Sequence, residues 1–228
     1  MRDVLALPRA PRGLADRVAA ALLAGDPRVT RLSDGRWALT GAAASPPLDA
    51  CRFAVVDVET TGRHPGHGGR IMEIAVVEVQ DGVVHRRFET LVDPQAPISP
   101  FAERLTGITA AALRGAPPFA RIADGLWETL AGAVFVAHNA RFDWMFVAAE
   151  LQRARGVLLQ GPRVCTLRLS RRLVKDVKGR RLERLTDYFG ITNRARHRAG
   201  GDAEATAQLL VRLLDLARER GAVTLADL

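Results

Sequence analysis

Two carboxylates interrupt an apolar run in the stretch from Phe53 to Gly62, which reads FAVVDVETTG. Its first half has the length and β-branched composition of a buried strand. Because side chains two apart on a strand share a face, Asp57 and Glu59 would project together. Paired buried charges are costly, and a divalent cation such as Mg²⁺ or Mn²⁺ would remove that cost. The alternative is a strand that ends at Val56, with both acids in solvent near a Thr-Thr-Gly turn.

The charge of the chain indicates a class of partner. Its 228 residues carry a formal net charge of +8, and nearly all of the positive charge is Arg, because Lys175 and Lys178 are the only lysines. Planar Arg side chains match phosphate geometry, so we expect nucleic acid as a partner. The alternative is a genome that prefers Arg and Ala codons, and the many Ala residues support it.

The composition argues against several other classes of protein. A hydrophobic content of 48% is typical of a globular chain, and no apolar run approaches the length of a membrane span. Two cysteines are too few for a disulfide framework or a cysteine-based zinc site. The first residues lack the long apolar core of a signal peptide, so we expect a cytoplasmic protein with no membrane partner.

Residues 1–47 are expected to form a small N-terminal helix-and-hairpin unit that ends in a linker. Residues 13–23 have helical spacing of their apolar side chains, and Asp34-Gly35 between two short alternating runs predicts a hairpin. Residues 41–47 have the composition of a linker. Such a unit resembles the tail of a winged-helix module that touches nucleic acid or a partner. We favour the alternative, in which it packs on the main domain.

The main domain is expected over residues 48–228. Three strands with short connections predict an antiparallel meander, after which helices alternate with two further strands. This pattern predicts an α/β fold with a mixed five-stranded sheet flanked by helices. After the strand that begins at Phe53, the expected strands are 70–79, 83–92, 133–139 and 163–166, and the expected helices are 99–105, 109–113, 119–130, 140–155 (with Asn139 as its N-cap), 167–173, 182–189 and 202–220.

Two further acids and a histidine occupy positions that favour chemistry. Asp143 falls in the first turn of the helix expected after a buried strand, among aromatic residues, although an acid there also suits the helix dipole. Asp202 is expected to open the last helix, where an Asp can be only a cap. His197 lies five residues earlier, in a glycine-containing loop able to move over a site beside Asp202.

Taken in order, these five residues resemble the catalytic set of the DEDDh branch of the DnaQ-like 3′–5′ exonucleases, and most closely the proofreading, DNA polymerase III epsilon-like type. The motifs VDVETTG at residues 56–62, HNARFD at 138–143 and HRAGGDA at 197–203 carry the resemblance, with LTGI at 105–108 and CTLRL at 165–169 as further landmarks. Two departures are Gly200-Gly201 and Thr106. The glycines could loosen the loop that carries His197.

The resemblance implies a ribonuclease H-like fold and a site for two Mg²⁺ or Mn²⁺ ions. Asp57 would bridge the two ions, while Glu59 and Asp202 would complete the site of the ion that holds the attacking water. Asp143 would serve the second ion, directly or through water. His197 would take the proton from the attacking water, because histidine exchanges protons near neutral pH.

The resemblance also implies contacts with the substrate. Residues of three motifs would surround the terminal nucleotide or shape the approach of the strand. Those near the terminal nucleotide would be Thr60, Thr61, Leu105 and Thr106, and those that shape the site would be His138 and Asn139.

We therefore expect a metal-dependent exonuclease that releases 5′-mononucleotides from nucleic-acid 3′ ends, with DNA preferred over RNA, in proofreading or repair. The expected partners are nucleic acid with a free 3′ end and a DNA polymerase. Two alternatives stay open at this point. One is an RNA-trimming exonuclease of the same branch, and the other is a polymerase-associated module that binds nucleic acid without a need for hydrolysis.

Overall fold

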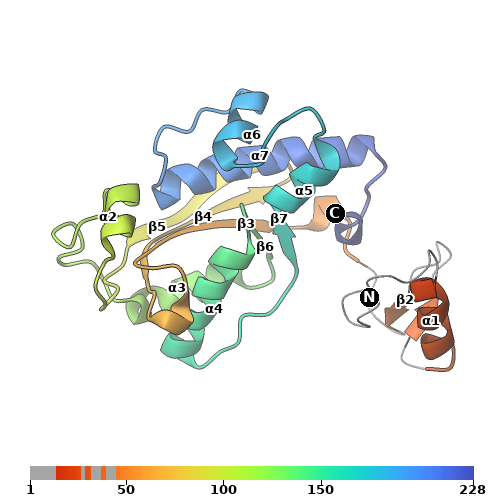
Figure 1. Ribbon diagram of the computed structural model, residues 1–228, viewed down its shortest axis with the longest axis horizontal. Coiled ribbons are helices and arrows are strands. Elements are labelled where there is room, and N and C mark those ends of the chain that lie inside the picture. The colour runs from red at the N-terminus through yellow and green to blue at the C-terminus, as the bar shows by residue number, and fades with distance from the viewer. Residues whose placement is uncertain (1–13, 27–28, 32–36, 40–44) are drawn as a thin grey trace. The chain divides into compact units, whose positions relative to one another are not determined.

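The computed structural model describes residues 14–26, 29–31, 37–39 and 45–228, and the chain divides into units of residues 1–45 and 46–228. The first unit contains helix α1 (Leu14–Leu23) and an antiparallel pair of strands, β1 (Val29–Arg31) and β2 (Trp37–Leu39) (Figure 1). The predicted hairpin turn and most of the predicted linker lie outside the described residues. The division falls two residues before the predicted boundary.

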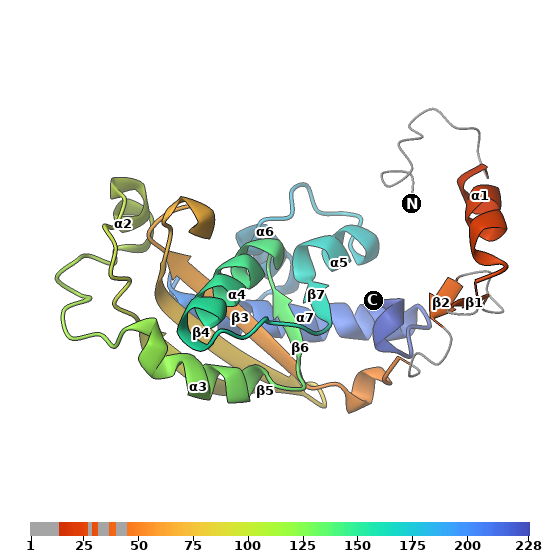
Figure 2. The same cartoon turned by 90° about the horizontal axis from the view of Figure 1, so that it is seen from below.

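The second unit is built on a five-stranded mixed sheet. Strands β3, β4 and β5 form an antiparallel meander, while β6 and β7 run parallel to β3, in the order β5-β4-β3-β6-β7 (Figures 1 and 2). The predicted α/β fold with a mixed five-stranded sheet is confirmed. The strands are β3 (Phe53–Thr60), β4 (Ile71–Gln80), β5 (Val83–Leu91), β6 (Val134–Ala137) and β7 (Arg163–Cys165).

Helices cover both faces of this sheet, which is why its central strands are almost continuously apolar. One face packs against α5, α6 and α7, and the other against α3 and α4 (Figures 1 and 2). The helices of the second unit are α2 (Pro100–Thr106), α3 (Phe119–Leu130), α4 (Arg141–Arg155), α5 (Thr166–Leu173), α6 (Leu182–Phe189) and α7 (Ala199–Glu219).

Alternate residues of β3 enter two different cores. Phe53 and Val55 pack with α7, whereas Ala54, Val56 and Val58 pack with α3 and α4. The period of two follows from the pleat of a strand. It assigns the odd-numbered residues of β3, including those beyond the core, to the face that α7 covers.

One predicted helix is absent, and the predicted starts of two others are wrong. Residues 109–113 form hydrogen-bonded turns and no helix, because so short a segment before the left-handed Gly115 cannot propagate one. Asn139 does not cap α4, since it has a φ of 70° and Ala140 precedes the helix. Helix α7 begins at Ala199, which places Asp202 inside its first turn and not at its cap.

Helix length and polarity also bear on membrane insertion. Among the helices of the described ranges, none is both long and apolar enough to cross a bilayer.

Candidate active site

Strand β3 continues past the core with its two acids on the face covered by α7. The strand runs to Thr60, which excludes the alternative in which it ends at Val56. Asp57 and Glu59 are both half-buried, and Val58 between them is only 5% exposed, on the opposite face. The spacing of two therefore places both carboxylates together, as predicted.

Helix α7 brings a third acid to this pair. One carboxylate oxygen from each of Asp57, Glu59 and Asp202 lies within 4.8 Å of the other two. Both oxygens of Asp202 also accept hydrogen bonds, from the Asn193 side-chain amide and from the His197 backbone N–H at 3.0 Å. A strand and a helix about 145 residues apart in sequence thus share one acidic cluster.

Asp143 approaches the same strand from α4. Its side chain is 4% exposed, and its Oδ1 accepts a hydrogen bond of 3.3 Å from the backbone N–H of Val58, between the two acids of β3. Asp143 is not one of the three acids that lie within 4.8 Å of one another. The structure therefore places it at the border of the cluster.

The acids of β3 resist ionisation. Burial raises the pKa of Asp57 well above its ordinary value, and the negative charges of Asp143, Glu59 and Asp202 raise it further. Burial, then Asp202, raises the pKa of Glu59 to about 8. Desolvation and like charge act in the same direction here, because both penalise the carboxylate form.

The two helix-borne acids behave in the same way. Burial raises the pKa of Asp143 to about 7 against the opposing hydrogen bond from Val58, and burial also raises the pKa of Asp202. Because the pKa of each of these four carboxyl groups is raised, all four can be anionic at once only if positive charge lies close to them. Carboxylate oxygens are the ligands that Mg²⁺ and Mn²⁺ prefer, so this set of donors fits a hard divalent cation.

His197 lies beside the cluster in a strained backbone conformation. Its φ is 58°, in the left-handed region that a residue with a side chain seldom adopts. The His197 N–H bond to Asp202 holds this conformation, and Asn193 supports the loop by accepting from the Ala195 N–H at 3.1 Å. The loop expected to move over the site is therefore tied to the cluster by hydrogen bonds in this structure.

Thr60, the last residue of β3, and Thr61, which follows it, lie beside the acids and are two of the residues expected to bind substrate. The Thr60 hydroxyl donates to the carbonyl of Gly62 at 2.7 Å, and the Thr61 hydroxyl accepts from the Arg70 N–H at 3.0 Å. Both residues are buried. Their hydroxyls stabilise the turn that leaves β3.

Leu105 and Thr106 end helix α2 and differ in exposure. Leu105 is 42% exposed, whereas Thr106 is buried and its hydroxyl donates to the Ala102 carbonyl at 2.9 Å. The helix is linked to the end of β3, because the N–H of its N-cap Ser99 donates to the carbonyl of Thr61 at 3.2 Å. Leu105 is therefore the member of this pair that a substrate can reach.

His138 and Asn139 follow β6. The His138 ring nitrogens contact the Thr166 hydroxyl at 2.9 Å and the Arg180 carbonyl at 2.8 Å. Burial lowers the pKa of His138. Asn139 is exposed. Since both His138 nitrogens have partners within the chain, its side chain orders the segment between β6 and α6.

The sequence reasoning missed an exposed aromatic residue close to this region. Phe101 lies four residues before Leu105 on α2 and is 53% exposed, and the Arg63 guanidinium lies 5.5 Å from its ring centroid. Residues four apart share a helix face, so Phe101 and Leu105 present one apolar surface. The signal was available in the sequence as a Phe one helical turn before LTGI.

Solved structures share this architecture. One is Exonuclease X in complex with 5′ overhanging duplex DNA, which matches with a TM-score of 0.59 and 29% identity over 72% of this chain and 91% of that chain. The mixed sheet with acids at the end of its central strand therefore belongs to the class of ribonuclease H-like exonuclease folds. More specifically, the RNase T exonuclease family model matches residues 54–210, and the chain belongs to this exonuclease family.

Curated relatives agree with this assignment. The 3′-5′ exonuclease DinG of Bacillus subtilis is 36% identical over 78% of this chain, and a DNA polymerase III subunit epsilon-like protein of Rhodobacter capsulatus is 38% identical over 80%. The chain spans 19% of the first protein and 26% of the second. The resemblance to DnaQ-like, epsilon-like exonucleases is thereby confirmed.

Proposed function

We propose that this chain is a divalent-metal-dependent 3′–5′ exonuclease that releases 5′-mononucleotides, with DNA as its preferred substrate. The observation that carries the proposal is the cluster of Asp57, Glu59 and Asp202 at the end of the central strand of an exonuclease-family fold. Three carboxylates with atoms inside 4.8 Å repel one another, and a function that binds cations explains why they are together.

Each acid has a proposed role. When bound, a pair of Mg²⁺ or Mn²⁺ ions supplies Lewis acidity to the scissile phosphate and lowers the pKa of water. Asp57, Glu59 and Asp202 would hold these ions from the α7 side of β3, and Asp143 would hold them from α4. His197 would accept the proton of the attacking water as general base. The leaving 3′ oxygen then departs with the shortened strand.

The substrate end is proposed to lie along α2. Thr60 and Thr61 would border the terminal nucleotide, with Leu105 and Thr106 against its base. The exposed Phe101 ring is suited to stack on a neighbouring base, and Arg63 beside it is suited to a backbone phosphate. His138 and Asn139 would shape the approach of the strand.

The preference for DNA is supported by the comparisons. Exonuclease X was solved in complex with duplex DNA, and one relative is named as a DNA polymerase III epsilon-like subunit. We therefore propose a free DNA 3′ end as the partner of the site, a DNA polymerase as a partner of the protein and the cytoplasm as its location.

Labelled oligomers test the proposal directly. With Mn²⁺ or Mg²⁺, 5′-labelled DNA should shorten one nucleotide at a time, and 3′-labelled DNA should release its label as a mononucleotide in the first step. EDTA and Asp57→Asn should each abolish both signals. Matched RNA oligomers measure the sugar preference. A pure chain that trims neither polymer with either metal would refute the proposal.

A further inference from the structure

Glu73 is a buried carboxylate immediately beside the acidic cluster. It lies on β4 directly opposite Glu59 of β3 in the antiparallel register, and it is 1% exposed. A further carboxylate at this position adds negative charge where three acids already repel one another. A buried charge without a partner is strongly unfavourable, so the contacts of Glu73 need an explanation.

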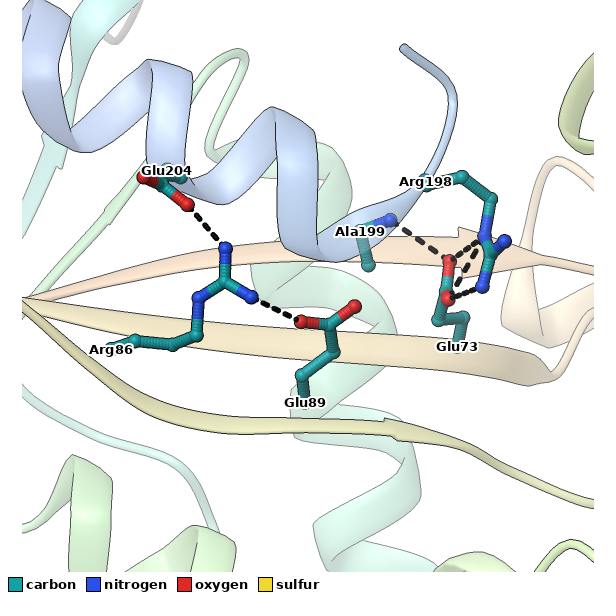
Figure 3. A network of polar contacts seen from close by, with 6 residues as sticks. All are labelled: Glu73, Arg86, Glu89, Arg198, Ala199 and Glu204. Carbon is teal, nitrogen blue, oxygen red and sulfur yellow. Dashed lines mark hydrogen bonds and ion pairs between the residues drawn. The ribbon is translucent and has the colours of Figure 1, made fainter. Parts of the chain in front are cut away.

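Both oxygens of Glu73 are used by the start of helix α7 (Figure 3). Arg198 donates through Nε to Oε1 at 3.0 Å and to Oε2 at 3.1 Å, and through Nη2 to Oε1 at 2.5 Å. The backbone N–H of Ala199 donates to Oε2 at 2.9 Å. Planar Arg–carboxylate pairs of this kind fix geometry as well as charge.

The two residues that Glu73 holds are next to catalytic candidates. Arg198 is the N-cap of α7 and Ala199 is its first residue. His197 precedes Arg198 directly, and Asp202 follows Ala199 by three residues in the first helical turn. Glu73 therefore connects the strand beside the acids of β3 to the segment that carries His197 and Asp202.

Two glycines let this segment approach closely. A Cβ on Gly201 would overlap the carbonyl oxygen of Ala195, and a Cβ on Gly200 would overlap the carboxylate of Glu89. The expectation that these glycines loosen the loop is thus not what the contacts indicate. The missing side chain of Gly201 lets the loop before α7 pack against the first turn of the helix, and that of Gly200 leaves room for the Glu89 carboxylate.

A second ion-pair group ties the next turn of α7 to the sheet (Figure 3). Arg86 of β5 pairs with Glu204 of α7, and it also donates to Glu89 at 3.3 Å. These side chains are 35–59% exposed, so their pairs are weaker than the buried one. Of the two ion-pair groups, the buried one at Glu73 is therefore the stronger link between the sheet and the start of α7.

We propose that Glu73 is a positioning residue that sets Asp202 and His197 against Asp57 and Glu59 through Arg198 and the helix N-terminus. The inference rests on the proposed exonuclease function. A direct role as a metal ligand is the competing explanation. The contacts argue against it, because both Glu73 oxygens are paired with the positive charge of Arg198, and Glu73 is not among the three acids whose oxygens lie within 4.8 Å of one another.

The test compares Mn²⁺ binding and cleavage by the full chain and its variants. Mn²⁺ affinity is measured by titration calorimetry, and kcat and KM are measured on a 5′-labelled DNA oligomer. Glu73→Gln and Arg198→Ala should each weaken Mn²⁺ binding by about tenfold or more and lower kcat by a similar factor, with KM changed by about twofold or less. The double variant should lose no more Mn²⁺ affinity than the single variant with the larger loss, because both substitutions break one contact.

Glu78→Gln is the matched control. Glu78 lies on the same strand, is 4% exposed and pairs with Arg52 at 2.9 Å, away from the acidic cluster. The Glu78→Gln variant should lose thermal stability, as Glu73→Gln does, but should keep the Mn²⁺ affinity and kcat of the wild type. Arg198 is 44% exposed, and the Ala199 N–H still donates to Glu73 in Arg198→Ala, so this variant is the second test if Glu73→Gln does not fold.

Three results would overturn the inference. The first is wild-type Mn²⁺ affinity in Glu73→Gln. The second is unchanged or tighter Mn²⁺ binding in Arg198→Ala, where tighter binding would mark the freed Glu73 as a ligand. The third is a loss of Mn²⁺ affinity in Glu78→Gln equal to that in Glu73→Gln. A wild-type chain that binds Mn²⁺ but trims no oligomer would instead refute the proposed function, while the calorimetric comparison would still decide the role of Glu73.

Discussion

Each carboxyl group of the cluster keeps its proton more readily than an ordinary acid does. Asp57 and Glu59 share a strand face that is largely withdrawn from water, and Asp143 and Asp202 add two more negative charges from helices. Without a cation, the folded chain therefore takes up protons that the unfolded chain releases. This difference makes the stability of the metal-free protein depend on pH.

The first prediction is that the metal-free protein becomes less stable as the pH rises from about 5 to 8. The folded pKa is about 8 for Glu59 and about 7 for Asp143, whereas both are near 4 in an unfolded chain. A raised folded pKa contributes stability that is complete below the unfolded value and is lost as the pH passes the folded value. Thermal melting in EDTA at a series of pH values measures this.

Manganese and a variant provide the controls for that measurement. Bound Mn²⁺ removes the repulsion, so the increase in Tm on adding Mn²⁺ should grow with pH over the same range. Glu59→Gln should flatten the curve in EDTA, because the group with a pKa of about 8 is then absent. A Tm in EDTA that rises steadily from pH 5 to 8 would contradict the electrostatic account.

The acids of the cluster were predictable from the sequence, but the role of Glu73 in positioning Asp202 was not. A spacing of two on an apolar strand is a local pattern, so Asp57 and Glu59 were predicted together. Asp202 was recognised as an acid at the start of the last helix, yet its place in the first turn was missed. The helix begins earlier because Glu73 accepts the Ala199 N–H from 126 residues away, and no local pattern records such a contact.

At the scale of elements, α2 combines a fixed position with an exposed apolar face. Its N-cap is bonded to the carbonyl of Thr61 at the end of β3, while Phe101 and Leu105 face solvent. An aromatic ring under a guanidinium next to the proposed active site is suited to base stacking and phosphate contact. The face should therefore contribute to binding of the strand and not to the cleavage step.

The second prediction concerns this face. Phe101→Ala should raise KM for a DNA oligomer by about tenfold, since one stacked base contributes about 1–3 kcal/mol, and should leave kcat and Mn²⁺ affinity unchanged. Steady-state kinetics on a 5′-labelled oligomer give both constants. If kcat falls and KM does not change, Phe101 acts on the chemistry or the fold and the stacking role is wrong.

Leu158→Ala is the control for the loss of an exposed apolar side chain. Leu158 is 67% exposed in the connection that leads to the start of β7. The acids lie toward the other end of the parallel strands, because Asp57 and Glu59 are in the C-terminal half of β3. This variant should have wild-type kinetics.

Elements with a strong period were predictable, and one short helix was predicted wrongly. Strands β3 to β6 alternate or run apolar over enough residues to be recognised, which indicated the meander and the mixed sheet. Residues 109–113 have helical composition, but five residues cannot offset the cost of starting a helix. Asn139 has the residue type of a cap, yet its left-handed backbone turns the chain into α4 instead.

At the scale of the whole molecule, the second unit holds the proposed site and begins earlier in the chain than the sequence predicted. The sheet, its helices and the whole acidic cluster lie within residues 46–228. The start of this unit is bonded to its end, since the Leu225 N–H donates to Pro46 O and the Leu48 N–H donates to Val223 O, both at 2.9 Å. A sequence boundary at residue 47 was drawn from composition, which does not record this pairing.

The third prediction is that a chain beginning at Pro46 folds and cleaves alone. It keeps both bonds to the C-terminal segment and every acid of the site, so its Tm, kcat and Mn²⁺ affinity should match those of the full chain. A chain beginning at Cys51 should melt at a lower temperature, because it lacks Pro46 and Leu48. Loss of cleavage in the first of these chains would assign the N-terminal unit a part in the reaction.

The most direct measurement of the central claim is a crystal structure of the full chain grown with Mn²⁺, with anomalous data collected at the manganese edge. The account predicts anomalous peaks at coordination distance from carboxylate oxygens of Asp57, Glu59 and Asp202, with Asp143 turned toward the same ions. Crystals that hold Mn²⁺ at other positions, and have no peak between these acids, would contradict it.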